Sequence, residues 1–206
     1  MPDNRPAGRA EPTNPPDRTL EAGAHPQSHA SDSLEALLPS PDAREGALYR
    51  RLAELGIGWT THSHAPVFTV DEARAIRGAL PSIHTKNLFL ENKRGGLWLV
   101  VAREDLRIDL NALAKELGQP RFSFGKPERL MAVLGIAPGA VTPFALMNHK
   151  AGLVTAVFDA GMLAEGPANF HPLRNDRTTA IAPADLVRFA RATGHEPLIA
   201  ELPERA

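Results

Sequence analysis

Two β-rich runs joined by a glycine-containing turn constrain this chain more than any other feature. The runs are Lys-Asn-Leu-Phe-Leu-Glu at 86–91 and Leu-Trp-Leu-Val-Val-Ala at 97–102, with Asn-Lys-Arg-Gly-Gly at 92–96 between them. Branched and aromatic residues on both sides of a short turn are typical of a β-hairpin. We therefore predict two neighbouring antiparallel strands here.

Helical and strand patterns alternate along the rest of the chain. Pro41 follows a capping serine, the next leucines recur at helical spacing, and Gly56 ends the pattern. Similar signals predict further helices over 70–78, 110–117, 127–134 and 183–193, and strands over 59–62, 144–148, 153–158 and 178–182. Strands interleaved with helices predict an α/β (mixed α+β) fold, with a mixed, largely antiparallel sheet flanked by helices.

The first 41 residues differ from the rest. They hold eight prolines and almost no aliphatic residues before Leu34, so they cannot bury enough apolar surface to offset the entropy of ordering. We predict a disordered proline-rich tail over 1–41 and one folded domain over 42–203. No apolar run has the length of a secretory signal or a membrane span, so we expect a cytoplasmic protein without a membrane partner.

Charge and cysteine content exclude several function classes. The chain has a formal net charge of −1, and beyond residue 41 it carries 20 Lys and Arg against 18 Asp and Glu. A near-neutral domain does not favour a broad nucleic-acid footprint, so any nucleic-acid partner should be held locally, at one end or one nucleotide. The absence of cysteine excludes disulfides, thiolate metal sites and a cysteine nucleophile.

Two stretches carry candidate ligand-binding groups. Lys86-Asn87 begins an apolar strand; Lys86 either extends its ammonium into water or holds a phosphate or hydroxyl at the rim of a pocket. The loop 135–143, Gly-Ile-Ala-Pro-Gly-Ala-Val-Thr-Pro, either connects a helix to a strand or directs backbone amides at a ligand.

A third stretch, Asn-Phe-His-Pro-Leu-Arg-Asn-Asp at 169–176, offers His171 for hydrogen bonding or proton transfer. A turn that simply satisfies the ring by hydrogen bonding explains it equally well. Metal chemistry has less support: the histidines at 62, 64, 84, 149 and 171 come with no HExxH or comparable carboxylate spacing. We expect no metal and no cofactor, and the sequence also has no GxSxG and no Walker loop.

Four motifs in this order resemble one family. They are HTKNLFL at 84–90, PGAVTPFALMN at 138–148, NFHPLRNDRTTAI at 169–181 and LVRFARATGHEPLI at 186–199. The sequence resembles the free-standing prolyl-tRNA editing proteins, the YbaK-like superfamily related to the insertion domain of bacterial prolyl-tRNA synthetase. It is most similar to the branch that hydrolyses alanyl-tRNA(Pro).

The resemblance assigns roles to residues of this chain. The family's strand lysine corresponds to Lys86 and its active-site histidine to His171, which implies that these two are the catalytic pair. By the same resemblance the substrate-binding residues are Asn87, Gly139, Ala140, Val141, Thr142, Pro143 and Asn175. One residue departs from the family pattern: His149 stands where relatives have an aspartate.

The implied activity is trans-editing: hydrolysis of mischarged Ala-tRNA(Pro) to alanine and tRNA(Pro). The implied partners are the aminoacylated 3′ end of tRNA(Pro) and a prolyl-tRNA synthetase. Two alternatives stay open: deacylation of another mischarged tRNA, carrying cysteine, serine or threonine, and non-catalytic binding of the aminoacyl-tRNA end.

Overall fold

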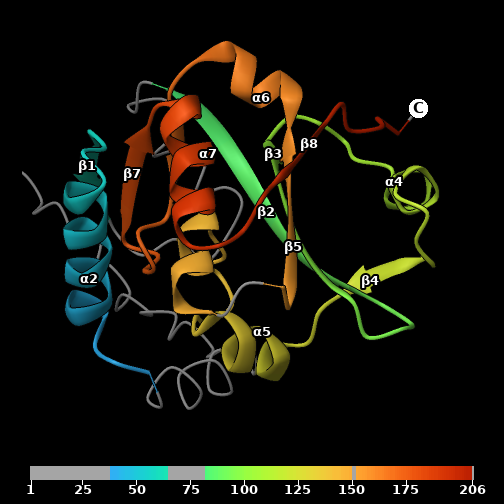
Figure 1. Cartoon of the computed structure of the whole chain (residues 1–206), viewed down its shortest axis with the longest axis horizontal. Helices are drawn as coiled ribbons and strands as arrows, with labels where there is room; N and C mark the ends of the chain where they lie inside the picture. The colour runs from blue at the N-terminus through green and yellow to red at the C-terminus, as the bar shows by residue number, and fades with distance from the viewer. Residues whose placement is uncertain (1–37, 65–81, 150–151, 206) are drawn as a thin grey trace, which may run out of the picture.

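The computed structural model describes residues 38–64, 82–149 and 152–205. Its helices are α2 (Pro41–Glu54), α4 (Leu110–Glu116), α5 (Pro127–Leu134), α6 (Ala160–Glu165) and α7 (Pro183–Ala192), with a 3-10 helix η1 (Pro143–Asn148). Its strands are β1 (Thr60–Ser63), β2 (Ile83–Asn92), β3 (Leu97–Arg103), β4 (Phe122–Phe124), β5 (Val154–Asp159), β6 (Ala168–Phe170), β7 (Arg177–Ile181) and β8 (Leu198–Ala200). Figure 1 shows the helices arranged around the sheet.

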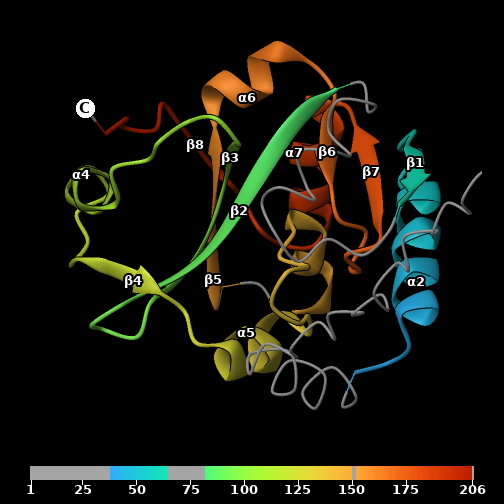
Figure 2. The same ribbon diagram turned by 180° about the vertical axis from the view of Figure 1, so that it is seen from behind.

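The strands form one eight-stranded mixed sheet. Along the sheet the order is β1-β7-β6-β2-β3-β5-β8, and β4 pairs with β2 beside this path. Within the described residues, the pairs β1–β7, β2–β3, β2–β4 and β6–β7 are antiparallel, and β2–β6, β3–β5 and β5–β8 are parallel. The predicted α/β class with a mostly antiparallel sheet flanked by helices is confirmed. Figure 2 shows β2 in the middle of this sheet from the opposite side.

The sheet has a separate core on each face, and β3 shows how the sequence produces both. Leu97, Leu99 and Val101 belong to the first cluster, whereas Trp98, Val100 and Ala102 belong to the second. Successive side chains of a strand point to opposite faces, so a continuous apolar run is buried on both sides. All three of the odd-numbered residues are under 5 % exposed.

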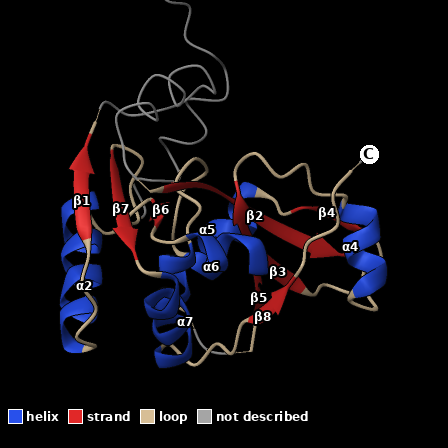
Figure 3. Ribbon diagram, turned by 90° about the horizontal axis from the view of Figure 1, so that it is seen from above, coloured by secondary structure: helices blue, strands red, loops and turns tan. Residues whose placement is uncertain are grey.

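Different helices cover the two faces. Five of the described helices pack their apolar side chains into the first core. Each contributes at least one buried residue: Leu48 of α2, Leu134 of α5, Phe144 of η1, Met162 of α6 and Phe189 of α7. The second core is covered by α4, through Leu113, and by the C-terminal segment, through Leu202. Figure 3 shows α2 and α7 under the β1–β7–β6 end, and α4 at the far end of the sheet.

Local capping signals placed the helices correctly. Ser40 accepts a hydrogen bond from the Ala43 amide at 3.3 Å, so Ser40 and Pro41 begin α2 as predicted. Asp109 accepts hydrogen bonds from the amides of Asn111 and Ala112 and caps α4, also as predicted. The hairpin at 86–102 is confirmed, with β2 running longer than expected. The helix predicted over 70–78 lies outside the described residues.

The strand predicted over 144–148 is wrong, because this segment is the 3-10 helix η1. The Thr142 hydroxyl accepts a hydrogen bond from the Phe144 amide at 3.3 Å, and Pro143 in the first turn supplies a helical φ. Thr-Pro was therefore a helix start signal, although the apolar residues that follow it suggested a strand. The short elements β4, α6, β6 and β8 were not predicted, since three to six residues carry little periodicity.

None of the helices in the described residues is long and apolar enough to span a membrane.

Candidate functional site

The candidate site lies where strands β2 and β6 stop pairing. Their parallel ladder has only two positions, Ile83 with Ala168 and His84 with Asn169. The Thr85 hydroxyl then donates to the carbonyl of Asn169 at 2.7 Å. Beyond this point β2 pairs with β3 and β4, whereas β6 ends at Phe170.

Lys86 and His171 occupy equivalent positions past the last ladder pair. Each lies two residues beyond it, on strands that run in the same direction. Phe170 packs in the first core, so Asn169 lies on the opposite face of β6. Lys86 shares its face of β2 with Leu88, which packs against the second core. The two predicted catalytic residues therefore follow the same ladder pair, Lys86 within β2 and His171 just after the end of β6.

Lys86 does not extend into bulk water. Its Nζ donates to the carbonyl of Glu104 at 3.2 Å and to the carbonyl of Leu106, both in the segment after β3. An ammonium has three donors, so two of them are held by these carbonyls. Burial lowers the pKa of Lys86, while the carboxylates of Asp105 and Glu104 oppose the shift. The side chain is thus a fixed cation on a central strand of the sheet.

His171 is held by the strand that follows it. Its Nδ1 lies 3.1 Å from the carbonyl oxygen of Arg177, so Nδ1 carries the proton and donates. Burial is the largest cause that lowers the pKa of His171, with His64 as a smaller cause in the same direction. The ring is therefore neutral near pH 7, with Nε2 as the nitrogen that can accept a proton.

His64 accompanies His171, and sequence reasoning did not assign it to the site. The two ring centroids are 6.4 Å apart, and Nε2 of His64 lies 2.9 Å from the Thr178 hydroxyl. Thr179 faces α2, where its hydroxyl bonds Tyr49, so Thr178 points to the face opposite α2. The alternation His62-Ser63-His64 along β1 was the available signal, since it places both histidines on one face.

The loop between His171 and Arg177 is anchored from its other side by α2. Arg177 donates to Glu45 at 2.8 Å, and Arg174 donates to Glu45 at 3.3 Å. The Arg174 guanidinium also donates two hydrogen bonds to the carboxylate of Asp176. The hydrogen bond from Arg174 lowers the pKa of the Asp176 carboxyl. This ion-pair network fixes the backbone that positions His171.

Burial also restrains this loop. Leu173 has φ 64°, a left-handed conformation that leucine rarely adopts, and its side chain is 1 % exposed in the first core. The Leu173 amide bonds the carbonyl of His171 at 2.9 Å. Such an outlier persists only where the surroundings hold it. The predicted binding residue Asn175 lies in this same loop and is half-buried.

The loop 139–143 lies on the other face of the sheet. Gly139 has φ 88°, which favours glycine, and the Ala140 amide donates to the Ala137 carbonyl at 3.2 Å. Among described residues, no partner accepts from the amides of Val141 and Thr142. Thr142 leads into η1, where Phe144 packs edge-on against Phe170, the residue before His171. The loop therefore reaches the end of β6 from the first-core side.

Asn87 points to the same face as this loop. It lies between Thr85 and Phe89 on β2, and Phe89 belongs to the first core. Its side-chain Oδ1 is buried and makes no hydrogen bond. An unsatisfied buried acceptor is costly and is commonly explained by a missing ligand or water. The predicted residues thus divide between two faces, and both groups adjoin the end of the β2–β6 ladder.

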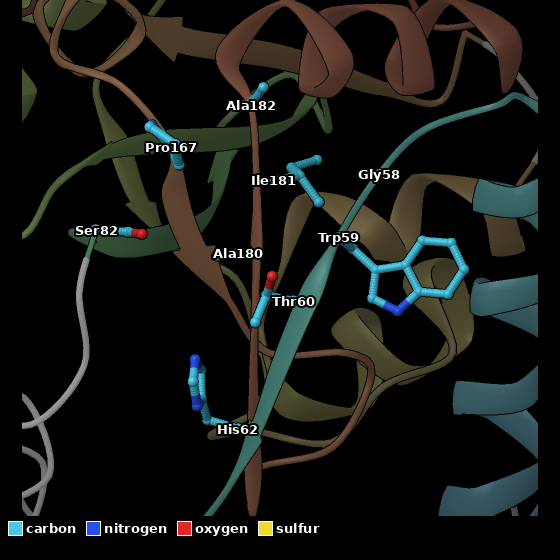
Figure 4. Close-up of a pocket in the computed structure, with 9 residues that line it drawn as sticks. All are labelled: Gly58, Trp59, Thr60, His62, Ser82, Pro167, Ala180, Ile181 and Ala182. Atoms are coloured by element: carbon cyan, nitrogen blue, oxygen red, sulfur yellow. The ribbon is translucent and has the colours of Figure 1, made fainter.

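A pocket of about 470 Å³ lies beside β1 and β7, and none of the predicted site residues lines it. Its lining comes from the segment before β1, from β1 and β7, and from Ser82 and Pro167 near the starts of β2 and β6. Figure 4 shows His62 and Ser82 bordering this pocket, with the Trp59 ring turned toward α2. Trp59 stacks on Tyr49 of α2 at 5.3 Å, which fixes that side of the pocket wall.

The described residues contain no group of three or more His, Cys, Asp or Glu side chains that could hold a metal ion. The donors of the site are instead an ammonium, imidazoles, hydroxyls and backbone amides. This set suits an oxygen-rich substrate such as a phosphate, a ribose or an ester.

The chain is similar to proteins named for aminoacyl-tRNA editing or for association with prolyl-tRNA synthetase. The family model for the aminoacyl-tRNA editing domain matches residues 64–189. Prolyl-tRNA synthetase associated domain-containing protein 1 of Bos taurus is 38% identical over 158 residues, covering 74% of this chain and 92% of the relative. Prolyl-tRNA editing protein ProX of Acetoanaerobium sticklandii is 34% identical over 155 residues, covering 75% and 94%.

Solved structures share the fold. A crystal structure described as "a putative trans-editing enzyme for prolyl tRNA synthetase" superposes with a TM-score of 0.62 at 24% identity, covering 81% of this chain and 99% of that one. A hypothetical protein, APE2540, gives a TM-score of 0.60 at 22% identity, covering 75% and 97%. At these identities the likeness supports the fold.

Proposed function

Because the chain belongs to the aminoacyl-tRNA editing domain family, we propose that it is a trans-editing deacylase that hydrolyses Ala-tRNA(Pro). The observation that supports this proposal is that a fixed cation, Lys86, and a neutral imidazole, His171, each lie two residues beyond the last pair of the β2–β6 ladder. The partners are the aminoacylated 3′ end of tRNA(Pro) and a prolyl-tRNA synthetase.

Lys86 anchors the terminal nucleotide in this proposal. Two carbonyls hold its ammonium in place, so the third N–H can donate to a phosphate or ribose oxygen without further ordering. A charge-assisted hydrogen bond of this kind is about twice as strong as a neutral one. Binding of one terminal nucleotide also fits a formal net charge of only −1, because contact with many phosphates along a duplex would need a cluster of Lys and Arg.

The reaction is hydrolysis of an ester. Water adds to the acyl carbon, the bond to the ribose oxygen breaks, and that oxygen takes a proton as alanine leaves. The amides of Val141 and Thr142 are the donors we assign to the developing oxyanion, since no described residue accepts from them. The adjacent free ribose hydroxyl helps to position the water, and so the substrate takes part in its own hydrolysis.

His171 completes the site as a neutral ring. With its Nδ1 proton donated to the Arg177 carbonyl, Nε2 is left to accept from the water or from the substrate amine. Asn87 adds an acceptor from the other face, since its buried Oδ1 lacks a partner. Asn175 lies in the loop that positions His171 and would border the same substrate.

Selectivity rests on the size of the aminoacyl group. A synthetase site built for proline cannot strongly exclude the smaller alanine, since each missing methylene changes binding by only about 1–3 kcal/mol. A second site that admits the methyl side chain and rejects the larger pyrrolidine ring removes the error without destroying correct product. This requirement favours alanine as the edited residue.

The test is deacylation of tRNA(Pro) charged with alanine, proline, cysteine or serine by the purified full chain. We expect rapid loss of alanine and little loss of proline. Faster release of cysteine or serine would assign a different specificity to the same site. Binding of all charged tRNAs without any release would favour a non-catalytic role instead.

A further inference from the structure

His149 and His195 form a second histidine pair, outside the site described above. Their ring centroids are 6.4 Å apart with an interplanar angle of 44°. His149 follows η1, and His195 follows α7. The Nε2 atoms of both rings are buried and make no hydrogen bond. Two unsatisfied nitrogens in adjacent buried rings call for a ligand that can satisfy both.

The tautomer of His195 follows from its neighbour Thr193. The Thr193 hydroxyl donates its proton to the Ala190 carbonyl at 2.8 Å, so its oxygen is an acceptor toward Nδ1 of His195 at 3.2 Å. Nδ1 therefore carries the ring proton, and Nε2 presents a lone pair. A histidine whose other N–H is held by an oxygen is the usual arrangement of a metal ligand.

Burial keeps both rings in the form that binds metal. His195 is 4 % exposed, whereas His149 is half-buried and provides the route from solvent. Desolvation lowers the pKa of each ring, and His149 lowers that of His195 further. Both imidazoles are therefore neutral near pH 7, and no proton has to leave before a metal binds.

The ring separation fits one arrangement of a bridging metal ion. Imidazole nitrogens bind late first-row metals at about 2.0–2.1 Å, and two such bonds together with the two ring radii reach the observed centroid separation when the two nitrogens lie on opposite sides of the ion. No third His, Cys, Asp or Glu from the described residues joins the pair, so water would complete the coordination. Imidazole donors favour copper, nickel and zinc over magnesium or calcium.

We propose that His149 and His195 bind one divalent late first-row metal ion, Cu²⁺, Ni²⁺ or Zn²⁺, through their Nε2 atoms. The metal links the segment after η1 to the turn after α7. That turn is held within the fold by the amide of His195, which donates to the Ala190 carbonyl at 2.9 Å. Metal binding therefore stabilises the native state and leaves the editing site untouched.

The His64–His171 pair provides an internal contrast. Its rings have the same 6.4 Å centroid separation, but Nε2 of His64 lies beside Thr178 and Nδ1 of His171 lies beside the Arg177 carbonyl. Ring separation alone therefore does not define the proposed metal site. The distinguishing property is the pair of buried Nε2 atoms without partners at His149 and His195.

The test measures binding of CuSO₄, NiCl₂ and ZnCl₂, each alone, to the full chain by calorimetry and by thermal unfolding. We expect one equivalent to bind and to raise Tm. His149→Gln and His195→Gln should each weaken that binding at least about tenfold, and the double variant should add little, because two ligands of one ion act as a unit. His62→Gln is the matched control and should bind as the parent does, while His25 and His29 remain in every variant.

A second measurement does not depend on variants that fold. Zn²⁺ added to the unmodified protein should shift the ring ¹⁵N signals of His149 and His195 together, at a ratio of one ion per chain. Equal binding in all variants, or zinc shifts confined to other histidines, would overturn the proposal and leave a water molecule or packing alone between the rings.

Discussion

Lys86 and His171 each lie two residues beyond the His84–Asn169 pair, the last pair of the β2–β6 ladder. No single local motif contains both residues, because 85 positions separate them in the chain. The short parallel ladder ends just before both residues. The Lys86 ammonium then bonds the segment after β3, whereas the His171 ring bonds the carbonyl of Arg177.

Replacement of Lys86 separates its anchoring role from its structural one. We expect Lys86→Met to lower the deacylation rate by about 10²–10³-fold, as loss of a fixed charged donor in an active site does. The same change removes the donor to the Leu106 carbonyl and should cost about 1–3 kcal/mol in the free energy of unfolding. Single-turnover deacylation and urea denaturation measure the two effects.

Lys86→Arg is the matched control because it keeps the charge. The guanidinium is a planar fork and cannot occupy the same three-donor geometry, so partial activity is expected. Full activity in the methionine variant would remove Lys86 from the mechanism.

His171→Asn tests whether the ring acts through Nε2. The asparagine amide can still donate to the Arg177 carbonyl and keep the loop in place, but it offers no nitrogen base. We expect kcat to fall by about 10²-fold, the usual contribution of a positioned base, with KM little changed. The pH–rate profile should also lose its acidic limb, which a purely structural role for His171 would leave in place.

Glu45→Gln should weaken the fold at the loop that positions His171. Glu45 is 4 % exposed and accepts from Arg174, Arg177 and Tyr49. Removal of its charge leaves the two guanidinium groups partly uncompensated, at a cost of about 2–3 kcal/mol in the free energy of unfolding. Urea denaturation measures the shift. Glu196→Gln, which breaks an exposed pair with Arg191, should leave the midpoint unchanged.

Three histidines whose pKa is lowered by burial predict a loss of stability in mild acid. Burial lowers the pKa of His149, His171 and His195 in the folded state, so the unfolded chain binds more protons as the pH falls below about 6.5. The free energy of unfolding should therefore be constant above pH 7 and decrease below it. Each group adds at most about 1.4 kcal/mol per pH unit.

Denaturation midpoints measured between pH 5 and pH 8 check this slope. The double variant His149→Gln, His195→Gln should show a shallower dependence than the parent. An identical slope in both proteins would show that other groups control the acid sensitivity.

Removal of residues 1–37 should leave deacylation nearly unchanged. The predicted tail has almost no aliphatic residues before Leu34, and α2 begins with its own cap at Ser40. Comparison of kcat/KM for the full and shortened chains provides the measurement. A large loss would assign the tail a role in binding tRNA or a partner.

Sequence patterns located the candidate site better than they described its geometry. The residue types of Lys86, His171 and the glycine loop pointed to oxygen-rich ligands, and caps such as Ser40 and Asp109 fixed where helices begin. His64 was missed because it enters the site only through β1–β7 pairing, at a ladder between distant segments. The strand expected at 144–148 failed because apolar residues alone cannot separate a 3-10 turn from a strand.

The sequence by itself determined the elements whose causes are local: the hairpin at 86–102, the capped helices and the apolar run of β3 that needs a core on each face. Only the tertiary structure decided that Lys86 and His171 follow the same ladder pair, that Asn87 and the loop 139–143 lie on the other face, and that His149 lies beside His195. Strand order and register depend on contacts between segments far apart in the chain, and a local pattern carries no information about which segments will pair.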